Sequence, residues 1–155
     1  MKFAIIHIGK TSDKGLRSFI EEFRKRLSRF AKLEIIVVNS PKGKLNAEEV
    51  KQKEADHVCK HLNSSDLVVL LDEGGASLTS RRFAKMISEH FLHRSQRMTF
   101  VIGGAYGFAD ILQKRSNESI SLSRMTFNHE LALAVFVEQL YRALTIINKH
   151  PYHND

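Results

Sequence analysis

Several apolar runs of this sequence end in segments whose residue types suit ligand binding. Residues 100–108 read FVIGGAYGF, so an apolar run stops at Gly103 and Gly104, and a third glycine follows at position 107. The spacing differs from the GxGxxG signature of dinucleotide-binding proteins. It also lacks the Lys-Ser/Thr ending of a phosphate-binding loop, and no clear helix start follows it. Taken alone, the segment could be a plain turn that needs a positive φ angle.

The same kind of segment occurs at two other places. LDEGG, residues 71–75, ends one apolar run, and a further segment of small residues, 122–127, follows another. In a parallel sheet the carboxyl ends of the strands lie along one edge, and open α/β sheets bind their ligands there. We therefore expect the three segments to form one pocket with walls made largely of backbone.

The end of the chain carries polar and aromatic side chains in a second candidate site. Residues 138–142 read EQLYR, and residues 150–153 read HPYH. Exposed Tyr, His and Arg side chains can stack on an unpaired base and hold a phosphate. In the alternative interpretation, Tyr141 packs in the core and the tail frays.

The hydrophobic periodicity predicts the elements that position these segments. Apolar runs typical of strands span residues 3–9, 33–39, 66–72 and 98–104, with a short fifth strand near 119–122. Helical patterns lie around 16–30, 47–62, 79–93 and 128–148, and Asn46 with Glu49 forms a predicted capping box before the second of them. This alternation predicts an α/β fold, a mainly parallel sheet flanked by helices on both faces, as a single domain over residues 1–155.

The last predicted helix is apolar on nearly every side over its middle. A helix of this kind must be covered on more than one face. We expect the sheet to cover one side and a second copy of the chain to cover the other, which makes the protein a homodimer. A central helix buried within one subunit is the alternative.

Composition limits the class of protein and its partners. The chain has 155 residues and a net charge of +7, which favours a polyanionic partner, with nucleic acid ahead of a membrane surface. Its one cysteine, Cys59, excludes an internal disulfide and is compatible with a reducing cytoplasm. No apolar stretch approaches the ~20 residues that cross a bilayer, and the first strand suits a fold better than a signal peptide. We expect a cytoplasmic protein with no membrane partner.

Taken together, the motifs resemble one family along the whole chain. LDEGG, FVIGGAYGF, SLSRMTFNHELALAVFVEQLYRA and NKHPYH are similar to the corresponding motifs of the RlmH-type methyltransferases of the SPOUT superfamily. The resemblance implies methylation of N3 of a pseudouridine in large-subunit ribosomal RNA, with S-adenosylmethionine as the methyl donor. It also implies a C-terminal trefoil knot and a homodimer whose active site lies at the subunit boundary. DNA is not an expected partner, and no metal site is expected.

The resemblance also implies roles for individual residues. The substrate side would comprise Arg142, Tyr152 and His153. By their chemistry, His129, Glu138 and His153 are the candidates for the general base, but for His129 the favoured interpretation is a helix-start residue without a proton-transfer role. Asn154 replaces a basic residue that usually follows PYH in the family. The expected donor contacts are Leu71, Gly103, Gly104, Leu122, Ser123, Arg124, Met125, Thr126 and Phe127.

Two other functions remain open from the sequence. One is a non-catalytic RNA-binding α/β protein that has lost donor binding. The other is a methyltransferase of the same superfamily that acts on tRNA. The chain is short and shows no added RNA-binding domain, which favours a preassembled surface such as the ribosome as substrate.

Overall fold

A computed structural model describes residues 1–93 and 96–153, and Asn154 lies outside them. Its centre is a five-stranded parallel sheet in the order β2-β1-β4-β3-β5. This confirms the predicted α/β fold with a parallel sheet. The trefoil knot stays a prediction. The strands are β1 (Lys2–Ile8), β2 (Lys32–Val38), β3 (Leu67–Ser77), β4 (Met98–Ile102) and β5 (Glu118–Ser121).

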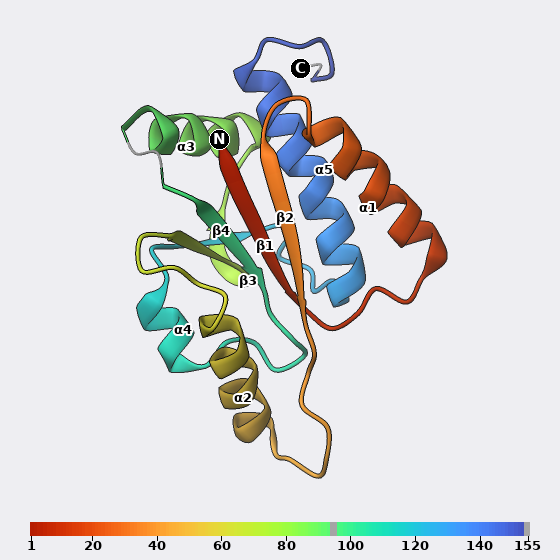
Figure 1. Cartoon of the computed structure of the whole chain (residues 1–155), viewed down its shortest axis with the longest axis vertical. Helices are drawn as coiled ribbons and strands as arrows, with labels where there is room; N and C mark the ends of the chain where they lie inside the picture. The colour runs from red at the N-terminus through yellow and green to blue at the C-terminus, as the bar shows by residue number, and fades with distance from the viewer. Residues whose placement is uncertain (94–95, 154–155) are drawn as a thin grey trace.

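Helices cover both faces of the sheet (Figure 1). One face packs against α1 (Lys14–Leu27), α3 (Ser80–His93) and α5 (His129–Ile147), and the other packs against α2 (Ala47–Cys59) and α4 (Asp110–Arg115). The alternation of side chains along β1 shows why. Phe3 and Ile5 enter the first core, whereas Ile6 and Ile8 enter the second. A strand covered on both faces is apolar at successive positions, as strands of parallel sheets usually are.

Local side chains set where two helices begin. Asn46 accepts a hydrogen bond from the Glu49 backbone, and the Glu49 carboxylate accepts one from the Asn46 backbone, which confirms the predicted capping box. Asn128 caps α5 with a single side-chain bond, which it accepts from the backbone N–H of Leu131 at 2.8 Å. The cap on α5 fixes the first turn of that helix beside the carboxyl edge of the sheet.

The structure corrects two sequence predictions. No helix was expected after the 103–107 segment, yet α4 begins at Asp110; it spans only six residues, too few for periodicity to reveal. The third strand was expected to stop at Glu73-Gly74-Gly75, yet β3 continues to Ser77. Leu71 and Ala76 both pair with Ile120, so the residues between them form an irregularity in a strand that resumes.

Helix α5 is covered mainly within its own chain. Phe136 packs against Phe83 of α3 and against Phe100 of β4, with ring centroids 5.9 and 4.6 Å apart, respectively. Tyr141 packs against Phe23 of α1 at 5.5 Å. This packing agrees with the alternative expectation, a helix buried within one subunit, so its general apolarity does not argue for a dimer. One less buried face remains, with Leu131, Val135, Glu138 and Arg142 at helical spacing.

A buried ion pair joins the amino ends of β3 and β4. Asp66 is 4% exposed and accepts hydrogen bonds from Arg97 at 2.6 Å and from the Thr99 hydroxyl at 3.0 Å. Burial alone would raise the pKa of the Asp66 carboxyl, but hydrogen bonds from Arg97, the Asn63 backbone and Thr99 hold it below its ordinary value. The pair therefore contributes to stability at neutral pH.

We expect Asp66→Asn to lower the free energy of unfolding at neutral pH by about 3 kcal/mol, because Arg97 loses its buried charge partner. A carboxyl with a lowered folded pKa stabilises the fold above its unfolded pKa, about 3.9 for Asp, and this contribution is lost as pH falls through the folded value. Urea unfolding should therefore show a difference between wild type and variant that shrinks below about pH 4.

The control for this prediction is the exposed partner of Arg97. Glu34 lies 3.4 Å from Arg97, and its side chain is 63% exposed. Glu34→Gln should change the free energy of unfolding by less than about 1 kcal/mol. Equal losses in the two variants would contradict the assignment of the stabilising pair to Asp66 and Arg97.

Candidate functional site

A pocket of about 710 Å³ lies at the carboxyl edge of the sheet. Its walls come from the ends of β3 and β4, from the segment after β5, and from the first turn of α5. The three segments that the sequence analysis singled out therefore meet in one place, as expected for strand ends in a parallel sheet. The lining residues are Leu71, Asp72, Glu73, Ile102, Gly103, Gly104, Ala105, Tyr106, Gly107, Phe108, Leu122, Ser123, Met125, Thr126, Phe127, Asn128, His129 and Ala132.

Glycines keep the wall after β4 thin. A Cβ atom on Gly103 would lie 3.0 Å from the Phe108 ring, and one on Gly104 would lie 2.7 Å from a carboxylate oxygen of Glu54. Gly107 has a φ of 76° and donates its N–H to the Gly104 carbonyl at 3.2 Å, which closes a tight turn. The turn thus needs the positive φ angle expected of it, and it also leaves its backbone open to the cavity.

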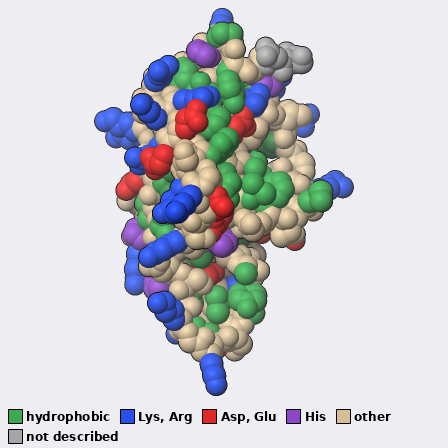
Figure 2. Space-filling model, turned by 90° about the vertical axis from the view of Figure 1, so that its right-hand side faces the viewer, with side chains coloured by type: hydrophobic (Ala, Val, Ile, Leu, Met, Phe, Trp, Pro, Cys, Tyr) green, Lys and Arg blue, Asp and Glu red, His purple; other side chains and the backbone are tan. Residues whose placement is uncertain are grey.

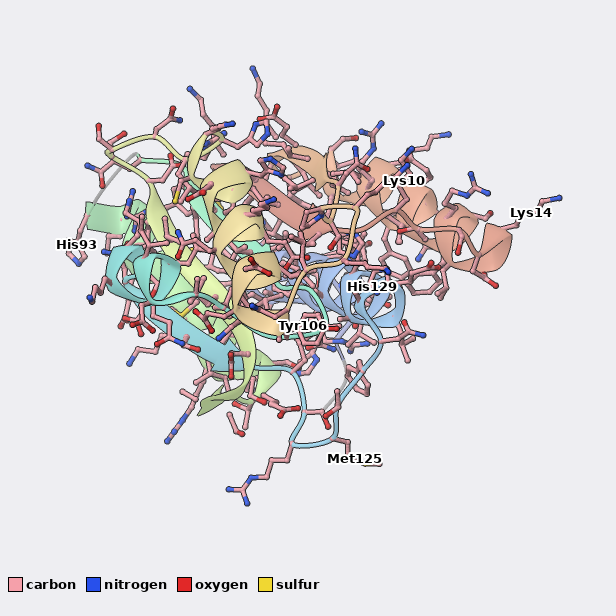
Figure 3. All side chains as sticks on the ribbon, turned by 90° about the horizontal axis from the view of Figure 1, so that it is seen from below. Lys10, Lys14, His93, Tyr106, Met125 and His129 are labelled. Atoms are coloured by element: carbon pink, nitrogen blue, oxygen red, sulfur yellow. The ribbon has the colours of Figure 1, made fainter. Side chains whose placement is uncertain are left out.

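Side-chain hydrogen bonds hold the segment after β5. The Ser121 hydroxyl donates to the Ser123 carbonyl at 2.8 Å, and the Ser123 hydroxyl accepts from the Met125 backbone at 2.9 Å. The Thr126 hydroxyl donates to Glu73 at 2.6 Å, which ties this segment to the irregular part of β3. In Figure 3, Met125 lies on the projecting loop, and its side chain is 77% exposed.

The pocket contains the predicted donor contacts with one exception. Arg124 is exposed and lies outside the lining, while all the others line the cavity. Several lining residues were not predicted from the sequence, among them Tyr106, Phe108, Asn128 and Ala132. Tyr106 and Phe108 lie within residues 100–108, and their position next to Gly107 could have identified them as lining residues. Asn128 and Ala132 belong to the first turn of α5, and only the tertiary packing brings that turn to the pocket.

A pair of histidines supports the α5 side of the pocket. His129 is the first residue of α5, as the helix-start interpretation expected, and it lines the cavity. The ring of His7 is completely buried beside it, with Nε2 3.0 Å from the His129 carbonyl. Burial lowers the pKa of His7, so the ring is neutral at neutral pH and its Nε2–H donates to that carbonyl.

Glu130 anchors the same turn to the segment after β1. Its carboxylate accepts hydrogen bonds from the Ser12 hydroxyl and backbone, at 2.7 and 2.9 Å, and from the Asp13 backbone at 3.1 Å. These bonds lower the pKa of Glu130 to about 2, so the anchor persists across the physiological pH range. The start of α5 is therefore fixed from two sides, by His7 and by the segment that leads into α1.

The predicted substrate-side residues form a second cluster. Glu138 accepts hydrogen bonds from Arg142 at 2.6 Å and from the Tyr152 hydroxyl at 2.9 Å. The Arg142 guanidinium lies 4.8 Å from the centroid of the Tyr152 ring and 3.3 Å from His153 Nδ1. Tyr141 is buried, as the alternative interpretation held, but the tail through His153 is docked on α5 rather than frayed.

Burial and the Glu138 carboxylate together shift the pKa values of Arg142 and Tyr152 in this cluster. The hydrogen bond to Glu138 raises the pKa of Arg142, which keeps the guanidinium charged. Burial, followed by the hydrogen bond to Glu138, raises the pKa of Tyr152, which keeps the phenol neutral. The cluster thus presents a fixed cation and a neutral hydroxyl, and Glu138 already has both as partners.

The cluster and the pocket lie at opposite ends of α5. His129 and Arg142 are separated by 13 positions, which corresponds to about 20 Å along a helix. Within one chain, the side chains of the cluster therefore do not reach the pocket. The structure brings together the donor-side residues in one group and the substrate-side residues in another.

The basic residues do not gather into one patch on the α1 side of the molecule. Figure 2 shows Lys and Arg side chains spread along this face with Asp and Glu between them. On α1, Arg24 and Arg26 pair with Glu21 and Glu22. Such exposed pairs contribute little to stability, and they reduce the charge that α1 offers to a polyanion.

Among residues 1–93 and 96–153, none of the helices combines the length and hydropathy of a membrane-spanning segment.

The fold and the pocket define an α/β protein of the kind that binds a small ligand at the carboxyl edge of a parallel sheet, against the backbone of three strand-end segments. Comparison with known proteins specifies the class further. The family described as "Predicted SPOUT methyltransferase" matches the chain over residues 1–153.

Curated relatives match the chain over its full length. A protein of Porphyromonas gingivalis strain ATCC 33277 is 40% identical over 157 residues, which cover 100% of both chains. A protein of Geobacter sulfurreducens is 41% identical over 154 residues, covering 99% of this chain and 100% of the relative. Both carry the name "Ribosomal RNA large subunit methyltransferase H". The chain belongs to the SPOUT methyltransferases and, within them, to the family of these relatives.

Proposed function

We propose that this protein transfers a methyl group from S-adenosylmethionine to N3 of a pseudouridine in large-subunit ribosomal RNA, in the cytoplasm. The observation that carries the proposal is the pocket, in which the three segments 71–75, 103–107 and 122–127 meet in a chain of the SPOUT family. The names of the relatives support large-subunit ribosomal RNA as the substrate. The pseudouridine and its N3 atom rest on the resemblance of the motifs.

The residues of the pocket fit the expected donor. A volume of about 710 Å³ lies within the usual range for small-molecule sites, and Gly103 and Gly104 let the ligand approach the backbone closely. Leu71, Leu122 and Phe127 supply apolar surface for an adenine ring and a methionine chain. When bound, S-adenosylmethionine supplies a methyl group on a positively charged sulfonium. A nucleophile that approaches the methyl carbon in line would take the methyl group, and the sulfur would leave as a neutral thioether.

The residues of this chain would orient the reacting atoms and stabilise the base after N3 has lost its proton. Holding the reacting atoms in attack geometry supplies much of the catalysis in a displacement of this kind. The N3–H of the base must lose its proton, either to water or to one of the remaining base candidates, His129 and His153. The fixed guanidinium of Arg142 suits the stabilisation of the resulting imide anion. Glu138 is occupied by Arg142 and Tyr152, so we assign it to positioning those groups rather than to the role of a free base.

A homodimer would join the two groups of residues into one site. The less buried face of α5 extends from Leu131 through Val135 to Arg142. Val135 is midway in sequence between Asn128, which lines the pocket, and Arg142. An antiparallel two-fold pairing of this face, centred near Val135, would therefore place the partner's Arg142 beside the pocket. Exposed apolar side chains near the pocket, Met125, Tyr106 and Leu131, are the kind of surface that a partner covers.

The segment from β1 to the start of α1, near His129, also offers positive charge for RNA. Lys10 and Lys14 are exposed, and in Figure 3 they lie on the α1 side of His129. Contacts from such side chains to phosphate would position RNA without reading its sequence. They would complement the base contacts from the partner's cluster.

We expect the protein to methylate ribosomes purified from a strain that lacks the modification. Mass spectrometry of the RNA should locate one new methyl group, on a pseudouridine of the large-subunit RNA, and tRNA incubated in parallel should gain none. Thermal unfolding should shift upward in the presence of S-adenosylmethionine, since the ligand binds only the folded chain. Methylation of tRNA would contradict the proposal and support the tRNA alternative. The absence of both a thermal shift and methylation of either RNA would contradict it in favour of the non-catalytic alternative.

A further inference from the structure

The pocket is acidic in a protein whose overall charge is positive. The chain carries a net charge of +7, yet Asp72 and Glu73 line the pocket and none of its lining residues is lysine or arginine. Within the described residues, the Asp72 carboxylate accepts a single backbone hydrogen bond, from Gly74 at 2.8 Å, and Glu73 accepts one from the Thr126 hydroxyl. Neutral donors leave the negative charge of both groups uncompensated.

A third carboxylate lies directly behind the pocket wall. Glu54 of α2 is 2% exposed, and its Oε1 atom accepts a hydrogen bond from the Ser40 hydroxyl at 2.6 Å. Its Oε2 atom has no hydrogen-bond partner in the described part of the chain. A Cβ atom on Gly104 would lie 2.7 Å from Oε2, so the carboxylate lies against the backbone of a residue that lines the cavity.

The fold gives no reason for this buried charge. A carboxylate oxygen without a partner is costly to bury, and such groups usually have a functional explanation. No Lys, Arg or His of residues 1–93 and 96–153 lies within ion-pairing distance of Glu54, Asp72 or Glu73. Ala55 and Val58, which follow Glu54 on α2, belong to an apolar core.

We propose that Glu54, together with Asp72 and Glu73, makes the pocket select the cationic methyl donor over its neutral product. This inference rests on the proposed function. S-adenosylmethionine carries a positive sulfonium, whereas S-adenosylhomocysteine, formed when the methyl group leaves, carries a neutral thioether. Opposite charges attract, most strongly where little water intervenes, as at the buried carboxylate of Glu54, so the three carboxylates favour the donor. The attraction to the sulfonium ends with the transfer, which aids release of the product.

The test compares the affinities of three ligands for the full-length protein by isothermal titration calorimetry. S-adenosylmethionine and S-adenosylhomocysteine differ in charge at sulfur, and sinefungin carries a protonated amine in place of the methylated sulfonium. In Glu54→Gln we expect about tenfold weaker binding of S-adenosylmethionine and of sinefungin, with a change of less than about twofold for S-adenosylhomocysteine. Glu48→Gln, an exposed site on the same helix, should leave all three affinities unchanged.

A second variant keeps the inference testable if Glu54→Gln folds poorly. Asp72→Asn, at the lining itself, should also weaken the two cationic ligands more than the neutral one, by about threefold. Equal weakening of all three ligands in these variants, or no weakening, would overturn the inference and leave Glu54 with a purely structural role. If the wild-type protein binds none of the three, the proposed function itself fails. If the wild-type protein binds the donor but the variants keep its preference for cationic over neutral ligands, only the charge selection is refuted.

Discussion

Replacing Gly75 with alanine is expected to lower the free energy of unfolding by about 3 kcal/mol and to abolish donor binding. A Cβ atom on Gly75 would lie 2.7 Å from the backbone nitrogen of Ile120 and from the carbonyl carbon of Ser119. Backbone atoms within a strand cannot yield as a side chain can, so β3 and β5 would have to separate. Both strands lead into walls of the pocket, at Leu71–Glu73 and at residues 122–127, so the pocket should open with them.

The neighbouring glycine offers a matched control for this prediction. A Cβ atom on Gly74 would lie 3.2 Å from a side-chain oxygen of Asp72, which can rotate away. Gly74→Ala should therefore cost less than about 1 kcal/mol. Urea unfolding measures the first effect, and the thermal shift with S-adenosylmethionine measures the second. Equal behaviour of the two variants would show that the close approach of β3 to β5 is not what requires glycine at position 75.

Two inactive variants are expected to restore activity when they are mixed, provided that the site is shared between subunits. Arg142→Ala removes the cation of the substrate side and should lower the rate of methylation by about 100-fold while donor binding persists. Gly104→Val should displace the pocket wall, because its side chain would take the space of the buried Glu54 carboxylate behind that wall, and should thereby abolish donor binding. Its added atoms meet the side chain of Glu54 rather than backbone, so the fold should survive.

The fraction of mixed dimers determines how much activity the mixture should recover. In a refolded equimolar mixture, half of the dimers contain one chain of each kind. Each of these has one site with an intact pocket and the intact Arg142 of its partner. The mixture should therefore reach about a quarter of the wild-type activity. A mixture with no more activity than its components would show that Arg142 serves the pocket of its own chain, or does not serve catalysis. Size-exclusion chromatography with light scattering must find both variants dimeric.

Much of the fold was predictable because it follows from local patterns. Buried strands such as 98–104 are recognisable from their apolar runs, and the cap at Asn46 from its partner Glu49. The failures have local causes as well. Helix α4 is too short to show a helical period, and the extension of β3 runs through Glu73-Gly74-Gly75, which reads as a stop signal. The strand resumes there because β5 offers backbone partners that no local pattern reveals.

The candidate site likewise has features that the sequence predicted and features that it did not. The glycine segments were predictable because strand ends of a parallel sheet share one edge, and the three of them do meet at one pocket. The residues of the substrate side were recognisable by type, and they do form a cluster. Their separation from His129 follows from sequence spacing along the predicted helix. That the first turn of α5 lines the pocket was not predictable, because only the packing of that helix on the sheet decides it.

The sequence by itself determined which segments could hold a ligand and which side chains could act on a base, because glycine, strand and aromatic patterns are local properties. Only the tertiary structure decided how these parts are joined. FVIGGAYGF became one wall of a shared pocket because parallel strands align their carboxyl ends. Glu54 came to lie behind Gly104 because α2 packs on the opposite face of the sheet from α5, a contact between positions 50 residues apart. Such contacts arise from packing, and no local pattern encodes them.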